Sequence, residues 1–193
     1  MNKKKIILDC DPGQDDAIMM LLAFSAPEKL DILGITTVAG NVPLNKTQRN
    51  ARIIAELAEQ KSIKIFAGCD KPLERKLVTA EYVHGLEGID GAPIFEPKIQ
   101  IEKQHAVDFI IDTLLSSQDN SITLVPTGPL TNIALAINKN PKILEKVFEI
   151  ILMGGAMREG GNTTPSAEFN IFVDPHAADI VFNCGKPIIV MPL

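Results

Sequence analysis

The sequence contains few aromatic residues, few cysteines and no long apolar run. It has no tryptophan, one tyrosine and eight phenylalanines in 193 residues, so we expect no aromatic platform on which single-stranded nucleic acid could stack. The three cysteines, Cys10, Cys69 and Cys184, are far apart and form no CxxC pair, which indicates a reducing compartment rather than a disulfide framework. No stretch approaches the length of about 18 apolar residues that a membrane-spanning helix needs.

Basic residues are too few to dominate the charge. The 19 Lys and Arg are outnumbered by 24 Asp and Glu, which gives a net charge of -5. Nucleic acids and anionic membranes attract basic patches, so we expect neither as a partner. The first apolar run covers only residues 6–8, which is too short for the hydrophobic region of a secretory signal. We therefore expect a cytoplasmic protein.

The chain instead shows a regular alternation of short apolar runs and longer helical patterns. Its hydrophobic fraction of 46% suits a globular domain with a sizeable core. The alternation predicts one doubly wound α/β domain over residues 1–193, with helices on both faces of a mostly parallel sheet. We expect a long loop at 69–104 that is functional or mobile. The expected strands are 5–8, 32–38, 63–67, 122–125, 150–153 and 188–191, and the expected helices are 16–25, 45–60, 105–117, 130–140, 142–147 and 174–183.

The most distinctive stretch is the acidic segment between the first expected strand and helix, which reads Asp-Cys-Asp-Pro-Gly-Gln-Asp-Asp-Ala at residues 9–17. Its carboxylates, Asp9, Asp11, Asp15 and Asp16, repel one another unless a cation joins them. In an open α/β sheet this turn lies at the carboxyl ends of the strands, where ligands bind. A hard cation with oxygen ligands would relieve this repulsion. The alternative is a solvated turn with Asp15 or Asp16 capping the helix.

The acidic segment resembles the signature of the nucleoside hydrolases, the inosine–uridine-preferring N-ribohydrolases. Further pieces resemble that family in the same order, and the likeness extends from residue 5 to residue 193. These pieces are Val38-Ala39-Gly40-Asn41, His84-Gly85, Pro126-Thr127-Gly128-Pro129-Leu130-Thr131-Asn132, Met153-Gly154-Gly155, Glu168-Phe169-Asn170 and Asp174-Pro175. The resemblance implies a nucleoside-hydrolase-like fold with a Rossmann-like core. It also implies calcium-dependent hydrolysis of the N-glycosidic bond of purine or pyrimidine ribonucleosides to ribose and free base.

Asp11 and Asp16 are the expected metal ligands, because flexible coordination by oxygen atoms suits Ca2+. The resemblance implies that Thr127 adds its backbone oxygen, which requires strand 122–125 to lie beside strand 5–8. The alternative is that Thr127 is only a turn residue. The resemblance also implies that Asp11 is catalytic and removes a proton from the attacking water. Asp9 is expected to hydrogen-bond the turn rather than to bind the metal.

The resemblance also implies the contacts to ribose. Asp15 is expected to bind the ribose 2'-hydroxyl, where a carboxylate would favour an oxocarbenium-like transition state. Asn162, Glu168 and Asn170 are expected to bind the ribose hydroxyls, the first two toward the 5' end. All three follow strand 150–153, so they can converge on the same end of the sheet.

Two further candidate site residues, Asn41 and His84, each have an alternative interpretation. The family pattern makes Asn41 a site residue that orients water or ribose, whereas an Asn after a Gly is often only a turn residue. His84 is expected to be a lid residue near the base, with a surface histidine as the alternative. His105 and His176 stand at helix starts, and we expect both to be structural.

The resemblance is incomplete at the C-terminal strand. Family members continue well beyond it, and there they supply a further metal-binding Asp and a His near the leaving base. We therefore expect the last part of the family fold to be missing and the chain alone to be a poor catalyst. The expected partner is a ribonucleoside, with a homo-oligomer where the full fold is present.

Two other functions remain as alternatives. One is a non-catalytic remnant that binds metal or ribose without turnover. The other is a phosphohydrolase of the haloacid-dehalogenase type, because Asp9-Cys10-Asp11 resembles its DxD motif at the end of the first strand. That family requires a downstream Lys and acidic pair, and Asp15-Asp16 come too early for this pattern.

Overall fold

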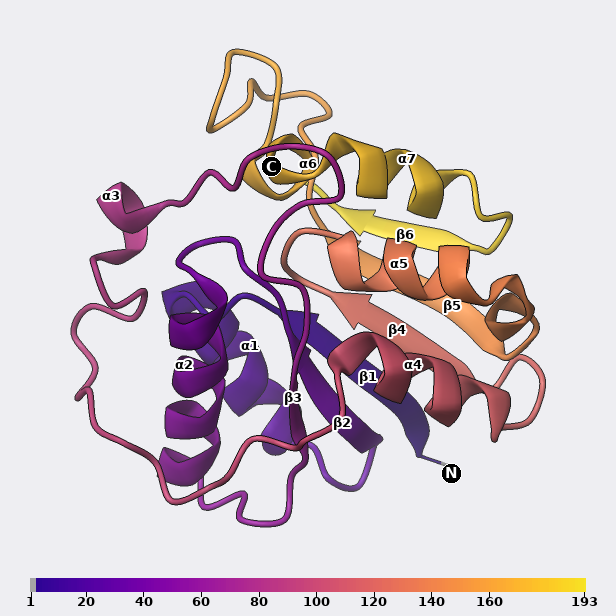
Figure 1. The fold of residues 1–193 in the computed structure, drawn as a ribbon, viewed down its shortest axis with the longest axis horizontal. Coiled ribbons are helices and arrows are strands. Elements are labelled where there is room, and N and C mark those ends of the chain that lie inside the picture. The colour runs from indigo at the N-terminus through magenta and orange to yellow at the C-terminus, as the bar shows by residue number, and fades with distance from the viewer. Residues whose placement is uncertain (1–2) are drawn as a thin grey trace.

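The central strand of the fold is β1, which carries the start of the acidic segment. The computed structural model describes residues 3–193, and in this part of the chain six parallel strands form one sheet in the order β3-β2-β1-β4-β5-β6 (Figure 1). The strands are β1 Lys4–Cys10, β2 Leu30–Thr37, β3 Ile65–Ala67, β4 Ile122–Pro126, β5 Val147–Met153 and β6 Ile188–Met191. The predicted parallel α/β sheet is confirmed. The predicted domain also includes Met1 and Asn2, which lie outside the described residues.

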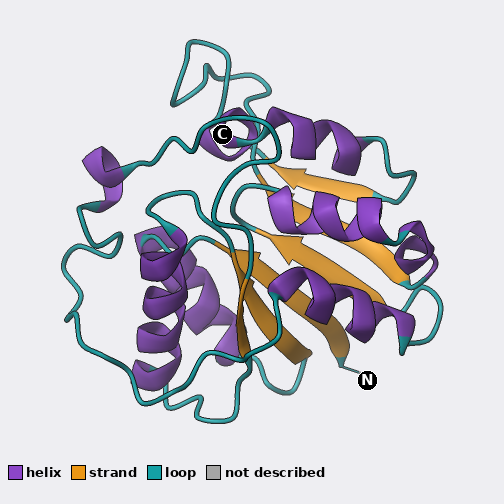
Figure 2. Cartoon of the chain, viewed as in Figure 1, coloured by secondary structure: helices purple, strands orange, loops and turns teal. Residues whose placement is uncertain are grey.

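Helices lie on both faces of the sheet (Figure 2). Helices α4, α5 and α7 form the layer drawn in front of β4, β5 and β6 in Figure 1, and α1 and α2 pack on the other face. The helices are α1 Gln14–Phe24, α2 Leu44–Leu57, α3 Glu81–His84, α4 Ala106–Leu115, α5 Thr131–Lys139, the 3-10 helix η1 Pro141–Glu145, α6 Phe169–Val173 and α7 Pro175–Phe182. Among residues 3–193, no helix is long and apolar enough to cross a membrane.

The pleat of β1 divides the apolar residues between two cores. Ile7 packs with α4 and α5 on one face, while Ile6 and Leu8 pack with α1 and α2 on the other, because successive side chains of a strand point to opposite faces. On β6, Ile189 and Met191 remain exposed. This strand therefore presents apolar side chains to solvent on the face opposite α7.

The acidic segment begins inside the sheet rather than after it. β1 extends two residues beyond the predicted end, and Asp9 pairs in register with Thr36 of β2 and Pro126 of β4. Helix α1 begins at Gln14 with Gly13 as its N-cap. The Gly13 backbone N–H donates to Oδ2 of Asp16 at 3.1 Å, so Asp16 acts from the third helical position. Asp16 thus caps the helix, as one alternative held, although Gly13 is the N-cap residue and Asp16 is buried rather than solvated.

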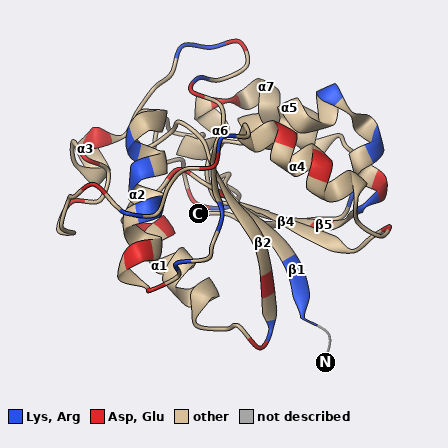
Figure 3. Ribbon diagram, turned by 60° about the horizontal axis from the view of Figure 1, so that its bottom comes forward, with Lys and Arg blue, Asp and Glu red and all other residues tan. Residues whose placement is uncertain are grey.

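Two short helices were absent from the sequence prediction. α3 has four residues and lies inside the predicted loop 69–104, and α6 has five. Neither is long enough to show a helical repeat of apolar residues. The ribbon of α2 carries several basic positions and lies beside a segment around α3 that carries acidic positions (Figure 3). Arg52 of α2 forms an ion pair with Glu96 of the long loop at 3.1 Å. The long loop is thus attached to α2.

We predict that Leu124→Ala destabilises the protein by about 2–5 kcal/mol, because it removes buried methyl groups and leaves a cavity. Leu124 is 1% exposed in the core under α4 and α5, whereas Leu22 of α1 is 70% exposed. Leu22→Ala is the matched control and should change stability by less than about 0.5 kcal/mol. Urea unfolding followed by circular dichroism measures both changes, and equal effects of the two substitutions would contradict this packing.

Candidate functional site

A pocket of about 210 Å³ opens at the carboxyl ends of the strands. Seven of the nine predicted site residues line it, and they come from α1, from α3 and from the segments that follow β2, β4 and β5. The lining residues are Asp15, Asn41, Ala80, Tyr82, Val83, His84, Thr127, Met153, Asn162, Thr163, Glu168, Phe169 and Asn170. The other two, Asp11 and Asp16, each accept a hydrogen bond from a lining residue. The structure therefore brings all nine together.

Asp11 lies fully buried next to the pocket residue Asn41. The backbone N–H of Asn41 donates to Asp11 Oδ2 at 2.7 Å, and its side-chain Nδ2 donates to the Asp11 carbonyl oxygen at 2.9 Å. Asn41 is therefore more than a turn residue. No described residue hydrogen-bonds the other carboxylate oxygen, Oδ1. Asp11 thus keeps one oxygen atom unpartnered at a buried position.

Two glycines make room for the Asp11 carboxylate. A Cβ atom at Gly40 would lie 2.0 Å from Oδ2, and one at Gly128 would lie 2.5 Å from Oδ1. Both distances are far below van der Waals contact, so any larger residue would displace the carboxylate. These contacts explain why glycine occupies both positions in the motifs after β2 and β4.

Asp16 is joined to the segment after β4 through Thr127. The Thr127 hydroxyl donates to Asp16 Oδ1 at 2.6 Å, and the Thr127 carbonyl oxygen accepts from Asn170 Nδ2 at 2.9 Å. Thr127 is therefore not only a turn residue, since its side chain and backbone link α1 to α6. Thr127 can reach the acidic segment only if β4 lies beside β1, and this predicted pairing of the two strands is confirmed.

Asp9 joins β1 to β2 and α5, whereas the expected hydrogen bond from its side chain to the turn is not formed among the described residues. Its Oδ1 accepts from the Thr36 hydroxyl at 2.5 Å and from Asn132 Nδ2 at 2.8 Å. Asn132 also accepts from the Cys69 backbone N–H at 2.9 Å, which fixes the start of the long loop. Sequence reasoning did not select Asn132, although it ends the Pro126–Asn132 motif.

The buried carboxylates of Asp9, Asp11 and Asp16 are difficult to ionise. Burial raises the pKa of Asp9 to about 6, and burial together with the charge of Asp15 raises the pKa of Asp16 to about 7. Burial and the charge of Asp16 raise the pKa of Asp11 well above its usual range. A bound cation would reverse this effect, because it favours the charged form of each carboxylate.

The donor set suits a hard cation such as calcium. Two carboxylates, Asp11 and Asp16, and the backbone oxygen of Thr127 are all oxygen donors, and Asp11 Oδ1 is buried without a partner. Ca2+ takes about 6–8 such oxygens, including backbone carbonyls. Residues 3–193 contain no group of three or more His, Cys, Asp or Glu arranged to hold a metal by themselves. The present residues therefore fit calcium as part of a coordination shell.

The three expected ribose ligands after β5 also shape the pocket wall. The Glu168 carboxylate is the N-cap of α6 and accepts backbone N–H bonds from Gly155 and Asn170, both at 3.0 Å. The Asn162 side-chain oxygen accepts from Phe169 N–H at 2.8 Å. Asn170 donates to the carbonyl oxygen of Met153 at 3.2 Å. These contacts hold the loop after β5 against α6 and leave its polar side chains at the pocket.

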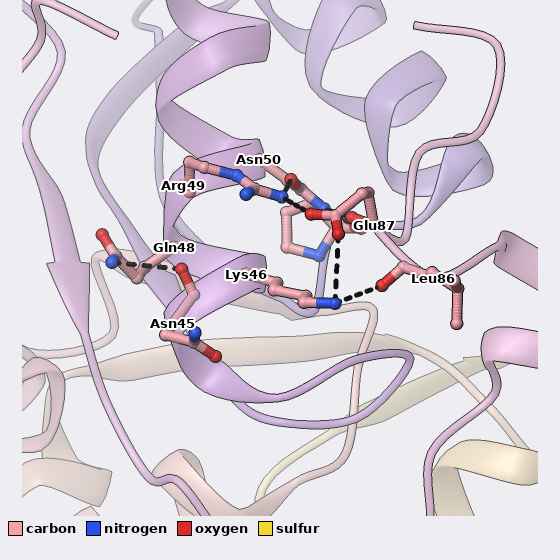
Figure 4. Close-up of polar contacts among 8 residues, drawn as sticks. Asn45, Lys46, Gln48, Arg49, Asn50, Leu86 and Glu87 are labelled. Atoms are coloured by element: carbon pink, nitrogen blue, oxygen red, sulfur yellow. Dashed lines mark hydrogen bonds and ion pairs between the residues drawn. The ribbon is translucent and has the colours of Figure 1, made fainter. Parts of the chain in front are cut away.

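The loop that carries His84 is anchored to α2. Glu87 accepts from Arg49 at 2.5 Å and pairs with Lys46 at 3.3 Å, and the Arg49 guanidinium holds the pKa of Glu87 below its usual range (Figure 4). Asn50 Nδ2 donates to the carbonyl oxygens of Glu87 at 2.7 Å and Pro12 at 3.2 Å. Sequence reasoning missed these anchors, because they join residues about 40 positions apart.

His105 and His176 lie away from the pocket, as expected. His105 is the N-cap of α4, and its Nδ1 accepts from the backbone N–H of Val107 at 3.2 Å. His176 lies in the first turn of α7 and pairs with Glu74 at 3.5 Å. Both contacts are structural.

Comparison with known proteins gives one consistent result. The family model described as inosine-uridine preferring nucleoside hydrolase matches residues 6–193. The pyrimidine-specific ribonucleoside hydrolase RihB of Escherichia coli is 53% identical over 194 residues, covering 100% of this chain and 60% of that protein. Among solved structures, a plant nucleoside hydrolase, PpNRh1, has a TM-score of 0.93 at 36% identity and is covered to 60% by the whole of this chain.

A second solved structure, the purine-preferring ribonucleoside hydrolase of Gardnerella vaginalis, has a TM-score of 0.92 at 37% identity over 98% of this chain and 61% of that chain. The chain thus spans about three fifths of the length of these relatives. This coverage agrees with the expectation that family members are longer.

We predict that the calcium-free protein loses stability as the pH rises from about 4 to about 7. The folded-state pKa of Asp9, about 6, lies above the unfolded value of about 3.9. The folded state therefore binds the proton more tightly, and its advantage disappears as the pH rises through 6. A shift of about 2 units corresponds to about 3 kcal/mol for this group.

Thermal unfolding in a calcium chelator across this pH range measures the effect. Asp9→Asn should flatten the slope between about pH 4 and 6, because it removes the titrating group. Asp31→Asn, at an exposed position near the start of β2, is the control and should keep the slope. A wild-type stability that rises over this range would contradict the buried carboxylate cluster.

Proposed function

Because this chain belongs to the inosine–uridine-preferring nucleoside hydrolase family, we propose that its pocket serves calcium-dependent hydrolysis of ribonucleosides to ribose and free base. The observation that carries this proposal is the buried Asp11 Oδ1, which has no partner among residues 3–193 and lies beside a pocket lined by several polar side chains. A carboxylate in this position can bind a cation and take a proton, which are the two tasks that the reaction requires.

Asp11, Asp16 and the Thr127 carbonyl would hold the calcium ion. Bound calcium would act as a Lewis acid that makes water easier to deprotonate. Asp11 takes the proton of the attacking water, while Asn41 keeps the second Asp11 oxygen fixed at 2.7 Å. The glycines at 40 and 128 leave the space in which this carboxylate lies.

The ribose would bind across the polar side of the pocket. Asp15, at the exposed start of α1, accepts a hydrogen bond from the 2'-hydroxyl and favours the positive charge of an oxocarbenium-like transition state. Asn162, Glu168 and Asn170 contact the other hydroxyls, and His84 lies toward the base. Each of these residues lines the pocket.

The dehalogenase-type alternative has little support from the geometry. Its first aspartate would have to be an accessible nucleophile, but Asp9 is 0% exposed, and the two residues that bind its Oδ1, Thr36 and Asn132, do not line the pocket. The non-catalytic alternative rests on the three-fifths coverage of the relatives. A cytoplasmic location and a homo-oligomer remain predictions.

Calcium binding is the first test of this proposal. Isothermal titration should detect Ca2+ binding to the wild-type chain and none to Asp11→Ala with Asp16→Ala, since the double variant removes both side-chain ligands. Binding should weaken below about pH 7, because protons then compete for Asp16. Asp31→Ala with Asp119→Ala removes two exposed carboxylates and is the charge-matched control. Equal binding by all three proteins would rule out this metal site.

Product release is the second test. With calcium, the chain should release free base from uridine or inosine, and Asp11→Ala should lower the rate by about 100- to 10,000-fold, the usual effect of losing a general base. The acidic segment should repel phosphate, so nucleotide monoesters should yield no phosphate. Phosphate release that Asp9→Asn abolishes would favour the dehalogenase-type function. Calcium and ribose binding without base release would favour the non-catalytic alternative.

A further inference from the structure

The side chain of Gln14 joins the acidic segment to the helix that carries His84. Gln14 is the first residue of α1, and its Oε1 lies 2.5 Å from His84 Nδ1. Its Nε2 lies 3.4 Å from the carbonyl oxygen of His84 and 3.5 Å from that of Asp90. One amide group thus contacts both the ring and the backbone of this pocket wall.

These contacts determine which nitrogen of His84 carries the proton. Backbone carbonyl oxygens only accept hydrogen bonds, so the NH2 group of Gln14 must face the carbonyls of His84 and Asp90. The amide oxygen then faces Nδ1, and because this oxygen also only accepts, Nδ1 must be the donor. In the neutral ring, Nε2 therefore carries a lone pair rather than a proton.

The position of the ring is fixed as well. A Cβ atom at Gly13 would lie 2.6 Å from His84 Nδ1 and 2.8 Å from Cε1, so this edge of the ring packs directly on the backbone of the acidic segment. His84 lines the pocket, and no residue in the range 3–193 hydrogen-bonds its Nε2. Gly13 provides the space and Gln14 the hydrogen bond that together orient the ring.

We propose that Gln14 is a positioning residue that holds His84 in the Nδ1–H tautomer, so that Nε2 accepts a hydrogen bond from a hydroxyl or N–H group of the ribonucleoside. The claim that the ligand is a ribonucleoside rests on the proposed function. The claim about the tautomer rests only on the contacts of Gln14. The inference therefore has a test that needs no turnover.

The anchors around Glu87 allow Gln14 to be changed without releasing the whole loop. Lys46, Arg49 and Asn50 hold the segment after His84 independently of Gln14 (Figure 4). Substitutions at Gln14 should therefore change the tautomer and orientation of the His84 ring, while the loop stays attached to α2. Hydrogen exchange of the backbone amides at 85–90 checks that this segment stays in place.

The decisive measurement is a two-bond ¹H–¹⁵N correlation spectrum of protein with labelled histidine. At about pH 8, above the usual histidine pKa of about 6.5, the wild-type His84 signal should show the Nδ1–H pattern, with His84→Gln used for assignment. Gln14→Ala should lose this pattern and shift toward Nε2–H. Gln14→Glu should retain it, because a carboxylate also accepts from Nδ1. His105 and His176 are internal references, and Gln48→Ala on α2 is the matched control that should change nothing.

Adding calcium and uridine or inosine tests the ligand. The Nε2 resonance of the wild type should shift, and Gln14→Ala should weaken nucleoside binding by about 2- to 10-fold, the loss expected for one neutral hydrogen bond. A wild-type Nε2–H signal, or a tautomer unchanged in Gln14→Ala, would overturn the inference even if nucleoside binds. An Nδ1–H signal without any nucleoside binding would support the positioning by Gln14 and count against the proposed function instead.

Discussion

The burial of three carboxylates at the carboxyl end of β1 is the constraint on which the surrounding structure depends. Buried carboxylates are costly unless hydrogen-bond donors or a cation reach them. The donors come from different parts of the chain: Thr36 of β2 and Asn132 of α5 reach Asp9, Asn41 reaches Asp11, and Thr127 reaches Asp16. The parallel sheet makes this convergence possible, since it brings the ends of β1, β2 and β4 to one edge. The pocket is therefore a consequence of how these charges are stabilised.

The long loop after β3 is held by the same network and by a small apolar cluster that joins Ala80 to Phe169 and Val173. Asn132 binds its start at Cys69, Gln14 binds its middle at His84, and Asn50 joins Glu87 to the carbonyl of Pro12 in the acidic segment. Tyr82 and Leu86 of this loop are exposed, whereas Ala80 and Ile89 are buried. Polar and apolar contacts therefore position the loop together, and the polar ones connect the pocket wall to the residues that would bind the metal.

The sequence was sufficient to predict the elements that depend on local pattern. The parallel α/β alternation is confirmed, and β6 has the predicted bounds, because four consecutive apolar residues between turn signals define it. Local pattern failed where few residues or distant partners decide the structure. The four residues of α3 and the five of α6 show no period, and Gln14 meets His84 across 70 positions of sequence. The nine site residues came from a family resemblance, and the structure adds Asn132, Asn50 and Gln14 as their supports.

Hydrogen-bond use separates the supports from the residues that can act on a ligand. Glu168 illustrates a support, because its carboxylate already accepts from the backbone N–H groups of Asn170 and Ile171 at the start of α6 and from that of Gly155, so any ribose contact must share these oxygens. Asp9 and Asp11 each have one fixed oxygen and one oxygen without a partner among residues 3–193, Oδ2 in Asp9 and Oδ1 in Asp11. They differ in position, since Asn41, the partner of Asp11, lines the pocket, whereas Thr36 and Asn132, the partners of Asp9, do not. In His84, Nδ1 is likewise fixed by Gln14, and Nε2 has no hydrogen-bond partner within residues 3–193. A fixed atom orients each group, and the free atom beside it is the one that can meet a cation or a nucleoside.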